Sequence, residues 1–528
     1  MDYTVGSPDF TKNDFSSNEA QVAYVYDPGV ADSKPGVDRI STLFMDKGYF
    51  SATPQLYWNY QGYGEGHYGR PELSFIRDFM SPLGKQRFDG AGGMPSKPVE
   101  TVKAYGASEY AASSLIVFQN GLITAGGVAT SGQNDMYYKP FPSNLVPTAA
   151  SVTNHGEFAL ITLWDTNTQK AKLAVIALGG SKPKDTFWNY EWQEVYPGFR
   201  NYSTWTFMKL LGYVDLPDMI APTAVEAVGS EMIGAGLGAN PGNKNAGEFP
   251  LTVQSNWNCF KANTECKYNT SGFALVSSRY EKKVTVVDLG PLFQKVKRSM
   301  FVDYNLFRQN VANVGMNDNQ YPQTFGVDSS QMPKVVRTLT FDKQVTAISA
   351  SLMRDNRGLV ALEDGTVQVF NMDGLQTGGS GANISKTTEF KSGRNITRIA
   401  HMRHAYTCCG DGAEVRYQFI LGSRGDNKAE WYDFKQGKII RTLQDSRIVD
   451  LIGLEDNANH GTQSDVLTVL DYKGKSVRGY RYGPVIFHTN GGNRFEMGKG
   501  SDGKSDFEYS GEYKTPTGPF LININNVT

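Results

Sequence analysis

The sequence predicts an all-β fold built from a repeated unit of four short strands. β-branched runs that end in turns recur along the chain, in the copies LAVIALGG from Leu173, VTVVDLG from Val284, DGTVQVFNMDG from Asp364 and AEWYDFKQGK from Ala429. The composition agrees, because 56 glycines supply turns and an aromatic content of 12% favours strands. Four short antiparallel strands joined by tight turns are typical of β-propeller blades, so we expect a β-propeller.

The first region of the chain, residues 1–100, departs from this pattern and is expected to be irregular, loop-rich and aromatic-rich. Its one strand-like run is QVAYVYDP, at residues 21–28. A short helix is expected from Pro71, because proline suits the first turn of a helix and the apolar residues that follow share one face. The propeller is expected to occupy residues 101–528.

Six blades can be followed through the interior of the chain. The first is expected to hold residues 113–127, and the others are expected to begin near residues 146, 222, 345, 395 and 447. The last three starts are about 50 residues apart, a spacing typical of large propeller repeats. Asn120-Gly121 and Asp364-Gly365 are expected to form hairpin turns, since these dipeptides favour a positive φ.

The two chain ends are expected to supply a seventh blade, with six blades as the alternative. Both 21–28 and the C-terminal run at 520–524 are strand-like. Closure is expected because an open ring would leave two large apolar blade faces exposed. If the C-terminal strand does not close its own ring, it would instead add to the sheet of a neighbouring molecule and build a homo-oligomer.

Three long insertions interrupt the propeller, at residues 181–221, 238–270 and 290–340. A short helix, MKLLGY, is expected at 208–213 in the first, and a second helix, PLFQKVKRSMF, at 291–301 in the third. Loops carried by a rigid scaffold are the usual place for partner contacts.

Residues 101–490 resemble the broad propeller superfamily of YVTN and WD40-like repeats. The resemblance rests on strand-turn-strand endings such as KLAVIAL at 172–178 and KVTVVDL at 283–289. The paired Gly-His and Trp-Asp signature of WD40 repeats is absent, although Trp431-Tyr432-Asp433 is similar to its second half. The resemblance implies a β-propeller fold and binding to partners, and it implies no reaction.

Charge and hydropathy exclude two classes of partner. The 52 basic and 53 acidic residues give a net charge of −1, and no basic patch indicates nucleic-acid binding. No apolar run approaches the length of a membrane span. The N-terminus MDYTVGSPDF is not a signal peptide. Composition and cysteine placement favour an extracytoplasmic location, periplasmic, secreted or on the cell surface, with the leader absent from this chain; a cytosolic protein is the alternative.

The chain has four cysteines, and the first two lie close together in the sequence. Cys259 and Cys266 are expected to close a polar loop tip with a disulfide in an oxidising compartment. The alternative is two unrelated surface thiols.

The segment HMRHAYTCCG contains two histidines and the other two cysteines, His401, His404, Cys408 and Cys409. Imidazole and thiolate ligands suit copper, zinc or iron, but one strand presents only two such ligands to a face. The alternatives are a vicinal disulfide or a buried thiol pair at Cys408-Cys409, and hydrogen-bonded histidines within a blade. Asp502, Asp506 and Glu508 are a second hypothesis, for calcium, against solvated turn residues.

Aromatic side chains gather in two segments outside the repeats. The candidate binding residues are Trp58, Tyr60, Tyr63, Tyr68, Trp188, Tyr190, Trp192 and Trp205. Aromatic faces stack on sugar rings and on partner side chains, so the two segments would form a binding platform if they meet. The alternative is that they pack on each other and on the propeller.

Three functions are consistent with these observations, and whether the protein is an enzyme stays open. The leading hypothesis is a secreted or surface propeller that binds a protein or glycan partner through its insertions. The main rival is an oxidoreductase with a metal or quinone, acting through His401, His404 and the Cys408-Cys409 pair. The third is a polysaccharide-active lyase or hydrolase. The Arg424-Gly425-Asp426 triplet, on an expected hairpin tip, adds adhesion as a minor hypothesis.

Overall fold

The computed structural model describes the chain over separate stretches. The described residues are 5–6, 20–26, 40–46, 49–50, 98–103, 114–126, 136–154, 156–179, 207–230, 253–264, 269–401, 417–456, 466–482, 505–515, 518–519 and 521–526. The chain divides into two compact units. The central unit holds Ser74–Val360 and Gln368–Glu389, and the terminal unit holds Met1–Leu73, Ala361–Val367 and Phe390–Thr528.

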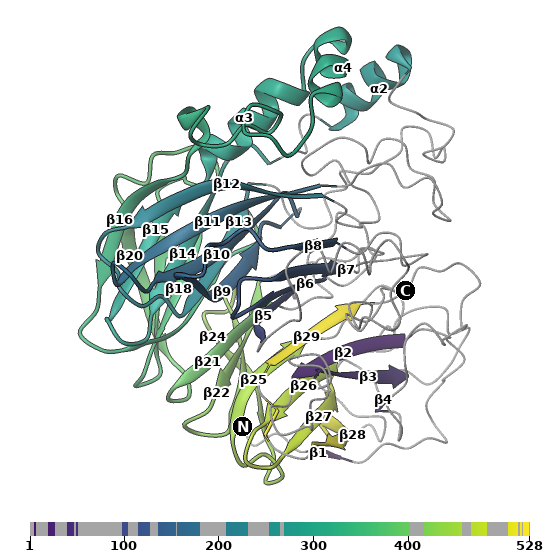
Figure 1. Ribbon diagram of the computed structural model, residues 1–528. Coiled ribbons are helices and arrows are strands. Elements are labelled where there is room, and N and C mark those ends of the chain that lie inside the picture. Colours follow the sequence, from purple (N-terminus) through teal and green to yellow (C-terminus); the bar gives the residue numbers. More distant parts are fainter. Residues whose placement is uncertain are drawn as a thin grey trace. The chain divides into compact units, whose positions relative to one another are not determined.

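Three four-stranded sheets formed by described residues lie within the central unit (Figure 1). The first contains β5 (Pro98–Lys103), β6 (Ser114–Phe118), β7 (Ile123–Gly126) and β8 (Met136–Tyr138). The second contains β9 (Leu145–Val152), β10 (Phe158–Asp165), β11 (Lys170–Gly179) and β12 (Phe207–Leu216). The third contains β13 (Ala224–Gly229), β14 (Gly272–Ser278), β15 (Lys283–Asp288) and β16 (Lys334–Thr340). In each, consecutive strands pair antiparallel.

The fourth sheet also has four strands. Its strands follow the chain in the order β17 (Val345–Ala350), β18 (Arg357–Leu362), β19 (Thr366–Asn371) and β20 (Ser385–Lys391).

The terminal unit holds three further sheets of described residues. One contains β21 (Ile396–His401), β22 (Gln418–Ser423), β23 (Lys428–Asp433) and β24 (Lys438–Gln444). The next contains β25 (Leu451–Asp456), β26 (Val466–Asp471), β27 (Ser476–Arg481) and β28 (Phe507–Lys514), with the short β1 (Val5–Gly6) added parallel to β28. The last combines β29 (Leu521–Asn526) with β2 (Ala20–Tyr26), β3 (Ile40–Asp46) and β4 (Tyr49–Phe50).

Consecutive sheets pack through their first strands. In the central unit β9 lies against both β5 and β13, and β13 lies against β17. In the terminal unit β25 lies against both β21 and β29. Four-stranded meanders that stack in this way are propeller blades, so the all-β propeller class predicted from the sequence is confirmed. The first strands found near residues 345, 395 and 447 also confirm those expected blade starts.

The apolar run of β11 shows why these strands read as continuous hydrophobic segments. Leu173, Val175 and Ala177 belong to one buried cluster, together with residues of the sheet β13–β16. Ala174 and Ile176, which alternate with them, belong to another cluster, shared with the sheet β5–β8. Because successive side chains of a strand point to opposite faces, a strand covered on both faces must be apolar at every position.

The two chain ends pair with each other. β2 pairs antiparallel with β29 over six residues, from Gln21 opposite Asn526 to Tyr26 opposite Leu521. The alternative in which the C-terminal strand adds to another molecule is therefore wrong, because this strand is already paired within its own chain. The N-terminal region is also more regular than expected, since β3 and β4 extend this sheet beyond β2. The helix expected from Pro71 lies outside the described residues.

The helix expected at 208–213 is wrong, because these residues belong to strand β12. β12 pairs with β11 along its length, with a bulge opposite Val175 and Ile176. The bulge moves the strand's alternation by one residue, so Met208 faces one buried cluster and Leu211 and Val214 face the other. Apolar residues at 208, 211 and 214 have the spacing of a helix face, and this is why the segment imitates one.

The insertions are shorter than the sequence suggested. β12 removes residues 207–216 from the first, and β16 removes residues 334–340 from the third. The third does begin with the expected helix, α3 (Gly290–Met300). The second contains α2 (Gln254–Thr264), where a loop tip was expected.

Candidate functional site

The sheets have two chemically different ends. In an antiparallel meander, the connections from first to second strand and from third to fourth strand emerge at one end, and all others emerge at the opposite end. We call the first the insertion end and the second the turn end of a sheet.

The connection lengths divide sharply between these ends in the six sheets other than the one formed by the chain ends. At the turn end, strands two and three are joined by residues 119–122, 166–169, 279–282, 363–365, 424–427 and 472–475. At the insertion end, the long connections are 104–113, 180–206, 230–271, 289–333, 402–417 and 482–506. Every long connection within these sheets therefore starts and finishes at the insertion end.

The turn-end hairpins share one backbone feature. A residue at the end of each, or one before the end in 119–122, has a positive φ; these residues are Gly121, Gln169, Lys282, Gly365, Asn427 and Lys475. A left-handed residue at this position matches the twist of the two strands and closes a tight hairpin. The expected turns at Asn120-Gly121 and Asp364-Gly365 are confirmed, with φ of 85° and 83° at the two glycines.

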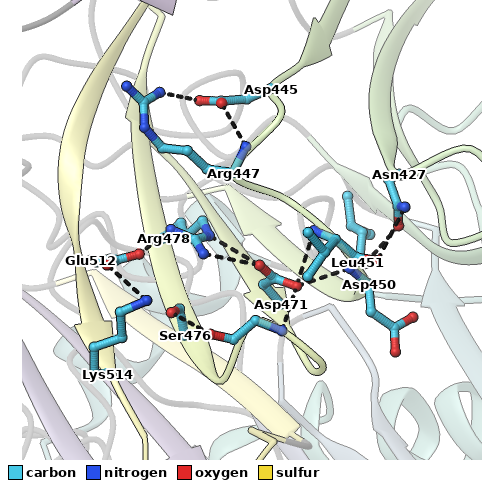
Figure 2. A network of polar contacts seen from close by, with 12 residues as sticks. Asn427, Asp445, Arg447, Asp450, Leu451, Asp471, Ser476, Arg478, Glu512 and Lys514 are labelled. Carbon is cyan, nitrogen blue, oxygen red and sulfur yellow. Dashed lines mark hydrogen bonds and ion pairs between the residues drawn. The ribbon is translucent and has the colours of Figure 1, made fainter.

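Polar side chains lock these turns to the neighbouring connections. Figure 2 shows the network around Asp471, which is fully buried at the end of β26. Its Oδ1 accepts hydrogen bonds from the backbone N–H groups of Val449 (3.2 Å), Asp450 (2.9 Å) and Gly474 (3.2 Å). Its Oδ2 accepts one from Nε of Arg478 at 3.1 Å. One carboxylate thus joins the β26–β27 turn to the connection that leads into β25.

Ion pairs extend this network along the turn end of the terminal unit. Arg424 pairs with Asp450 at 2.7 Å, and Arg447 pairs with Asp445 at 2.6 Å. Asp426 accepts a hydrogen bond from the Arg394 guanidinium at 2.7 Å. The Arg-Gly-Asp triplet does lie on a hairpin turn, but both of its charged groups are used in these contacts, which argues against adhesion through it.

Asp165 has the same role in the central unit, at the end of β10. Its carboxylate accepts hydrogen bonds from the side chains of Asn144 (2.9 Å) and Thr168 (2.8 Å). These bonds stabilise the charged form and lower the pKa of Asp165 from 3.8 to about 2. The turn end is therefore short and internally bonded.

The insertion end of the sheet β13–β16 carries a group of three helices, which we call the helical cap. It consists of α2, α3 and α4 (Tyr304–Ala312), and Figure 1 shows the three grouped on one side of the central unit's strands. The short helix η7 (Ser329–Gln331) follows, and the chain then enters β16. Because α2 comes from the connection 230–271 and the other two from 289–333, both insertions of one sheet build the cap.

The cap is held together by aromatic stacking. Trp257 of α2 stacks on Phe307 of α4, with ring centroids 3.7 Å apart and planes within 7°. Phe301, between α3 and α4, lies 6.4 Å from the same indole. Phe293 of α3 meets Phe158 of the sheet β9–β12 edge-on at 5.7 Å. The cap is thus packed onto the propeller as part of its apolar core.

A buried lysine fastens the segment that follows α4. Lys209 of β12 is 1% exposed, and its ammonium donates hydrogen bonds to the backbone carbonyls of Gly315 (3.0 Å), Asn317 (2.7 Å) and Gln320 (3.0 Å). Burial lowers the pKa of this lysine, and the charge of Asp318 opposes that effect. Its three donors are all used, so Lys209 is a structural anchor.

A second buried polar group lies at the insertion end of the central unit. Glu157 is fully buried and accepts hydrogen bonds from the Thr153 hydroxyl (2.6 Å) and the Asn269 amide. Asn154 accepts one from the backbone N–H of Gly229 at 2.6 Å. These residues fix the ends of the connections to neighbouring strands. Glu157 also supplies the acceptor for the buried Asn269 amide.

The predicted metal ligands are not brought together in the described part of the chain. His401 ends β21, is 3% exposed and has its ring 4.8 Å from that of Phe419, so it is part of the core. His404, Cys408 and Cys409 lie outside the described residues, and the metal and oxidoreductase hypotheses stay predictions. The described residues contain no group of three or more His, Cys, Asp or Glu side chains placed to hold a metal ion.

The remaining candidate residues are only partly described. The two aromatic segments, at 58–68 and 188–205, lie outside the described residues. Cys259 lies in α2 and Cys266 lies outside, so the disulfide stays a prediction. Asp506 and Glu508 are described but Asp502 is not, which leaves the calcium hypothesis a prediction as well.

The sequence did not reveal the helical cap as a unit. Trp257 is far from Phe301 and Phe307 in the sequence, and no local pattern links them. Only the fold shows that the three rings meet. The apolar spacing of α3 was a usable signal, whereas α2 is polar along most of its length.

No described helix is long and apolar enough to cross a membrane.

Sequence comparisons assign no family to this chain. No protein-family model matches the chain, and a search of curated proteins finds no match. Among solved structures, the chain is similar to the Pan2 WD40 domain of Neurospora crassa, with 8% identity and a TM-score of 0.34. The similarity covers 72% of this chain and 74% of that domain. The fold assignment rests on the sheets and their packing.

Proposed function

We propose that the protein is a non-catalytic β-propeller scaffold that binds a protein or glycan partner at the insertion end of its sheets. The observation that carries this proposal is the division of connection lengths, because every long connection within the six sheets leaves from that end. Short, internally bonded turns fix the opposite end. A rigid frame with long connections on one side is the usual design of a binding protein.

Four of the eight aromatic candidates support the same end, whereas Trp58, Tyr60, Tyr63 and Tyr68 belong to the connection 51–97 between β4 and β5 and are not part of this proposal. Trp188, Tyr190, Trp192 and Trp205 belong to the connection 180–206, which leaves β11 and enters β12 at the insertion end. Aromatic side chains are enriched where proteins contact protein or sugar partners. The proposal takes these four residues as one part of the binding surface and the helical cap as another.

The proposal includes an extracytoplasmic location. It is supported by the composition and by the pair Cys259 and Cys266, which would be oxidised there. Alkylation of the protein from its natural source, with and without prior reduction, tests this. Finding both thiols free before reduction would count against the location and the disulfide together.

The test of the binding end compares two sets of substitutions. One variant carries Trp188→Ala, Trp192→Ala and Trp205→Ala, and its matched control carries Trp164→Ala and Tyr280→Ala, two exposed aromatics at the turn end. Both are assayed on a glycan array and by quantitative affinity capture. We expect the first variant to lose at least tenfold in binding and the control to keep it. Loss in the control alone would place binding at the turn end and overturn the proposal.

A further inference from the structure

The helices of the cap have a one-sided charge. α2, α3 and α4 together contain Lys261, Lys295, Lys297, Arg298 and Arg308, and their sequences contain no Asp or Glu. The whole chain, by contrast, has nearly equal numbers of acidic and basic residues and a net charge of −1. A local excess of one sign on a balanced protein attracts ligands of the opposite sign.

Most of these cations have no ion-pair partner among the described residues. Lys295 pairs with Asp328 at 2.7 Å. The other four form no ion pair with any described residue, although Lys261, Lys297 and Arg308 are half-buried. At the turn end, arginines such as Arg424 and Arg447 are paired. The cap therefore presents positive charge that the protein does not neutralise within its described part.

The aromatic stack joins the three helices that carry these cations. Lys261 is one helical turn beyond Trp257, and Arg308 follows Phe307, the residue on which Trp257 stacks. The backbone N–H of Phe301 donates to the carbonyl of Lys297 at 3.1 Å, which places Lys297 one turn before the same aromatic group. The three helices that carry the cations therefore meet around one aromatic group.

Apolar side chains accompany the charge. Leu306 on α4 is 40% exposed, and Met316, which follows that helix, is 48% exposed. A simple inorganic anion gains nothing from apolar contacts. Protein interfaces, in contrast, combine apolar anchors with charged groups at their rim.

We infer that the helical cap is the docking surface for an acidic polypeptide segment that carries apolar side chains among its carboxylates. This inference rests on the proposed function and names the chemistry of the partner. The carboxylates would pair with Lys261, Lys297, Arg298 and Arg308, and the apolar side chains would contact Leu306 and Met316.

The test uses a defined probe, a fluorescein-labelled peptide of glutamates interrupted by two leucines, titrated with the full-length protein at low and high salt. The cap variant carries Lys297→Glu, Arg298→Glu and Arg308→Glu. The matched control carries the same charge change at the turn end, Lys170→Glu, Lys282→Glu and Lys473→Glu, all exposed in the structure. Thermal unfolding of each variant shows that it is folded.

We expect the probe to bind the wild-type protein, to bind the cap variant at least tenfold more weakly, and to bind the control within twofold of wild type. A matching peptide of lysines and leucines should not bind. Affinity should fall as the salt concentration rises, because the contacts are ionic. Equal weakening in both variants would show an effect of net charge alone, and no binding to the wild type would also overturn the inference.

Two further ligands test whether the negatively charged partner is a polypeptide, a polysaccharide or a membrane. If heparin fragments or phosphatidylserine vesicles bind the cap more tightly than the peptide does, an anionic polysaccharide or a membrane is the occupant and the inference is wrong. Failure of the proposed function is recognised separately. In that case the Trp188, Trp192 and Trp205 substitutions leave partner binding unchanged, whatever the peptide does at the cap.

Discussion

At the scale of single residues, buried carboxylates organise the turn end. Asp471 accepts three backbone hydrogen bonds and one from Arg478 without any exposure to solvent (Figure 2). Asp471→Ala should lower the free energy of unfolding by about 3 kcal/mol or more, because it leaves three backbone donors without an acceptor and removes one of the two carboxylates that pair with the buried Arg478 guanidinium. Chemical denaturation measures this change. The exposed Asp342→Ala should change stability by less than about 0.5 kcal/mol, and a similar small effect at Asp471 would refute this role.

The hydrogen bonds to Asp165 predict how acid affects stability. Its pKa is about 2 in the folded protein, below the ordinary value of 3.8, so folding favours the carboxylate. The resulting stabilisation is fully present above pH 4 or so and is lost as the pH falls through 2. The difference in unfolding free energy between wild type and Asp165→Asn should therefore shrink over that range. A difference that stays constant with pH would show that the carboxylate's charge plays no part.

Residue-scale features were predictable where the signal is local. Asn120-Gly121 and Asp364-Gly365 predict their turns because each dipeptide by itself favours the positive φ that the turn requires. The role of Asp471 was not predictable, because its partners at 449 and 450 come from another connection. His401 shows the same limit, since its burial against Phe419 depends on the packing of two strands.

At the scale of secondary-structure elements, the helical cap depends on one aromatic contact. Phe307 is fully buried beneath the Trp257 ring. Phe307→Ala should destabilise the cap by about 3 kcal/mol, the usual cost of deleting a buried phenyl group. Amide hydrogen exchange should then rise in α2, α3 and α4 while strands β9–β11 stay protected. The neighbouring exposed residue supplies the control, because Leu306→Ala should leave exchange in the cap nearly unchanged.

Elements could be predicted when their periodicity was undisturbed. α3 follows its apolar spacing, with Leu292, Phe293, Val296 and Met300 buried on one face. The sequence of β12 imitates a helix because a bulge near Gly212 shifts the alternation of its buried side chains between the two faces. α2 has no clear apolar face beyond Trp257, so the local sequence does not predict a helix there. The packing of Trp257 on Phe307 explains why the helix forms.

At the scale of the whole molecule, one sheet joins the two chain ends. Strand β29 pairs with β2 and lies against β25. Deleting residues 518–528 should remove the cooperative unfolding transition or leave an aggregating protein, because it exposes a strand edge and an apolar face. Deleting only Val527 and Thr528, beyond β29, should leave thermal unfolding unchanged. A stable, monomeric product of the longer deletion would contradict the pairing.

The repeated four-stranded unit was the most predictable feature of the molecule, because the strand-and-turn pattern recurs along the chain. The extent of the last sheet was not predictable in the same way. β3 and β4 lie in a region whose composition suggests loops, and their pairing with β2 is a property of the closed sheet. The unequal ends of the sheets were not predictable, because they depend on which two strands each connection joins.

The central claim is that a partner binds at the insertion end, and lysine cross-linking of the protein to its captured partner tests it most directly. The lysines Lys261 and Lys297 lie on the helical cap, whereas Lys170, Lys282 and Lys473 lie at or beside turn-end hairpins. The claim predicts cross-links from the partner to the first two residues and none to the other three. Cross-links concentrated at Lys170, Lys282 and Lys473 would contradict it and place the partner at the opposite end.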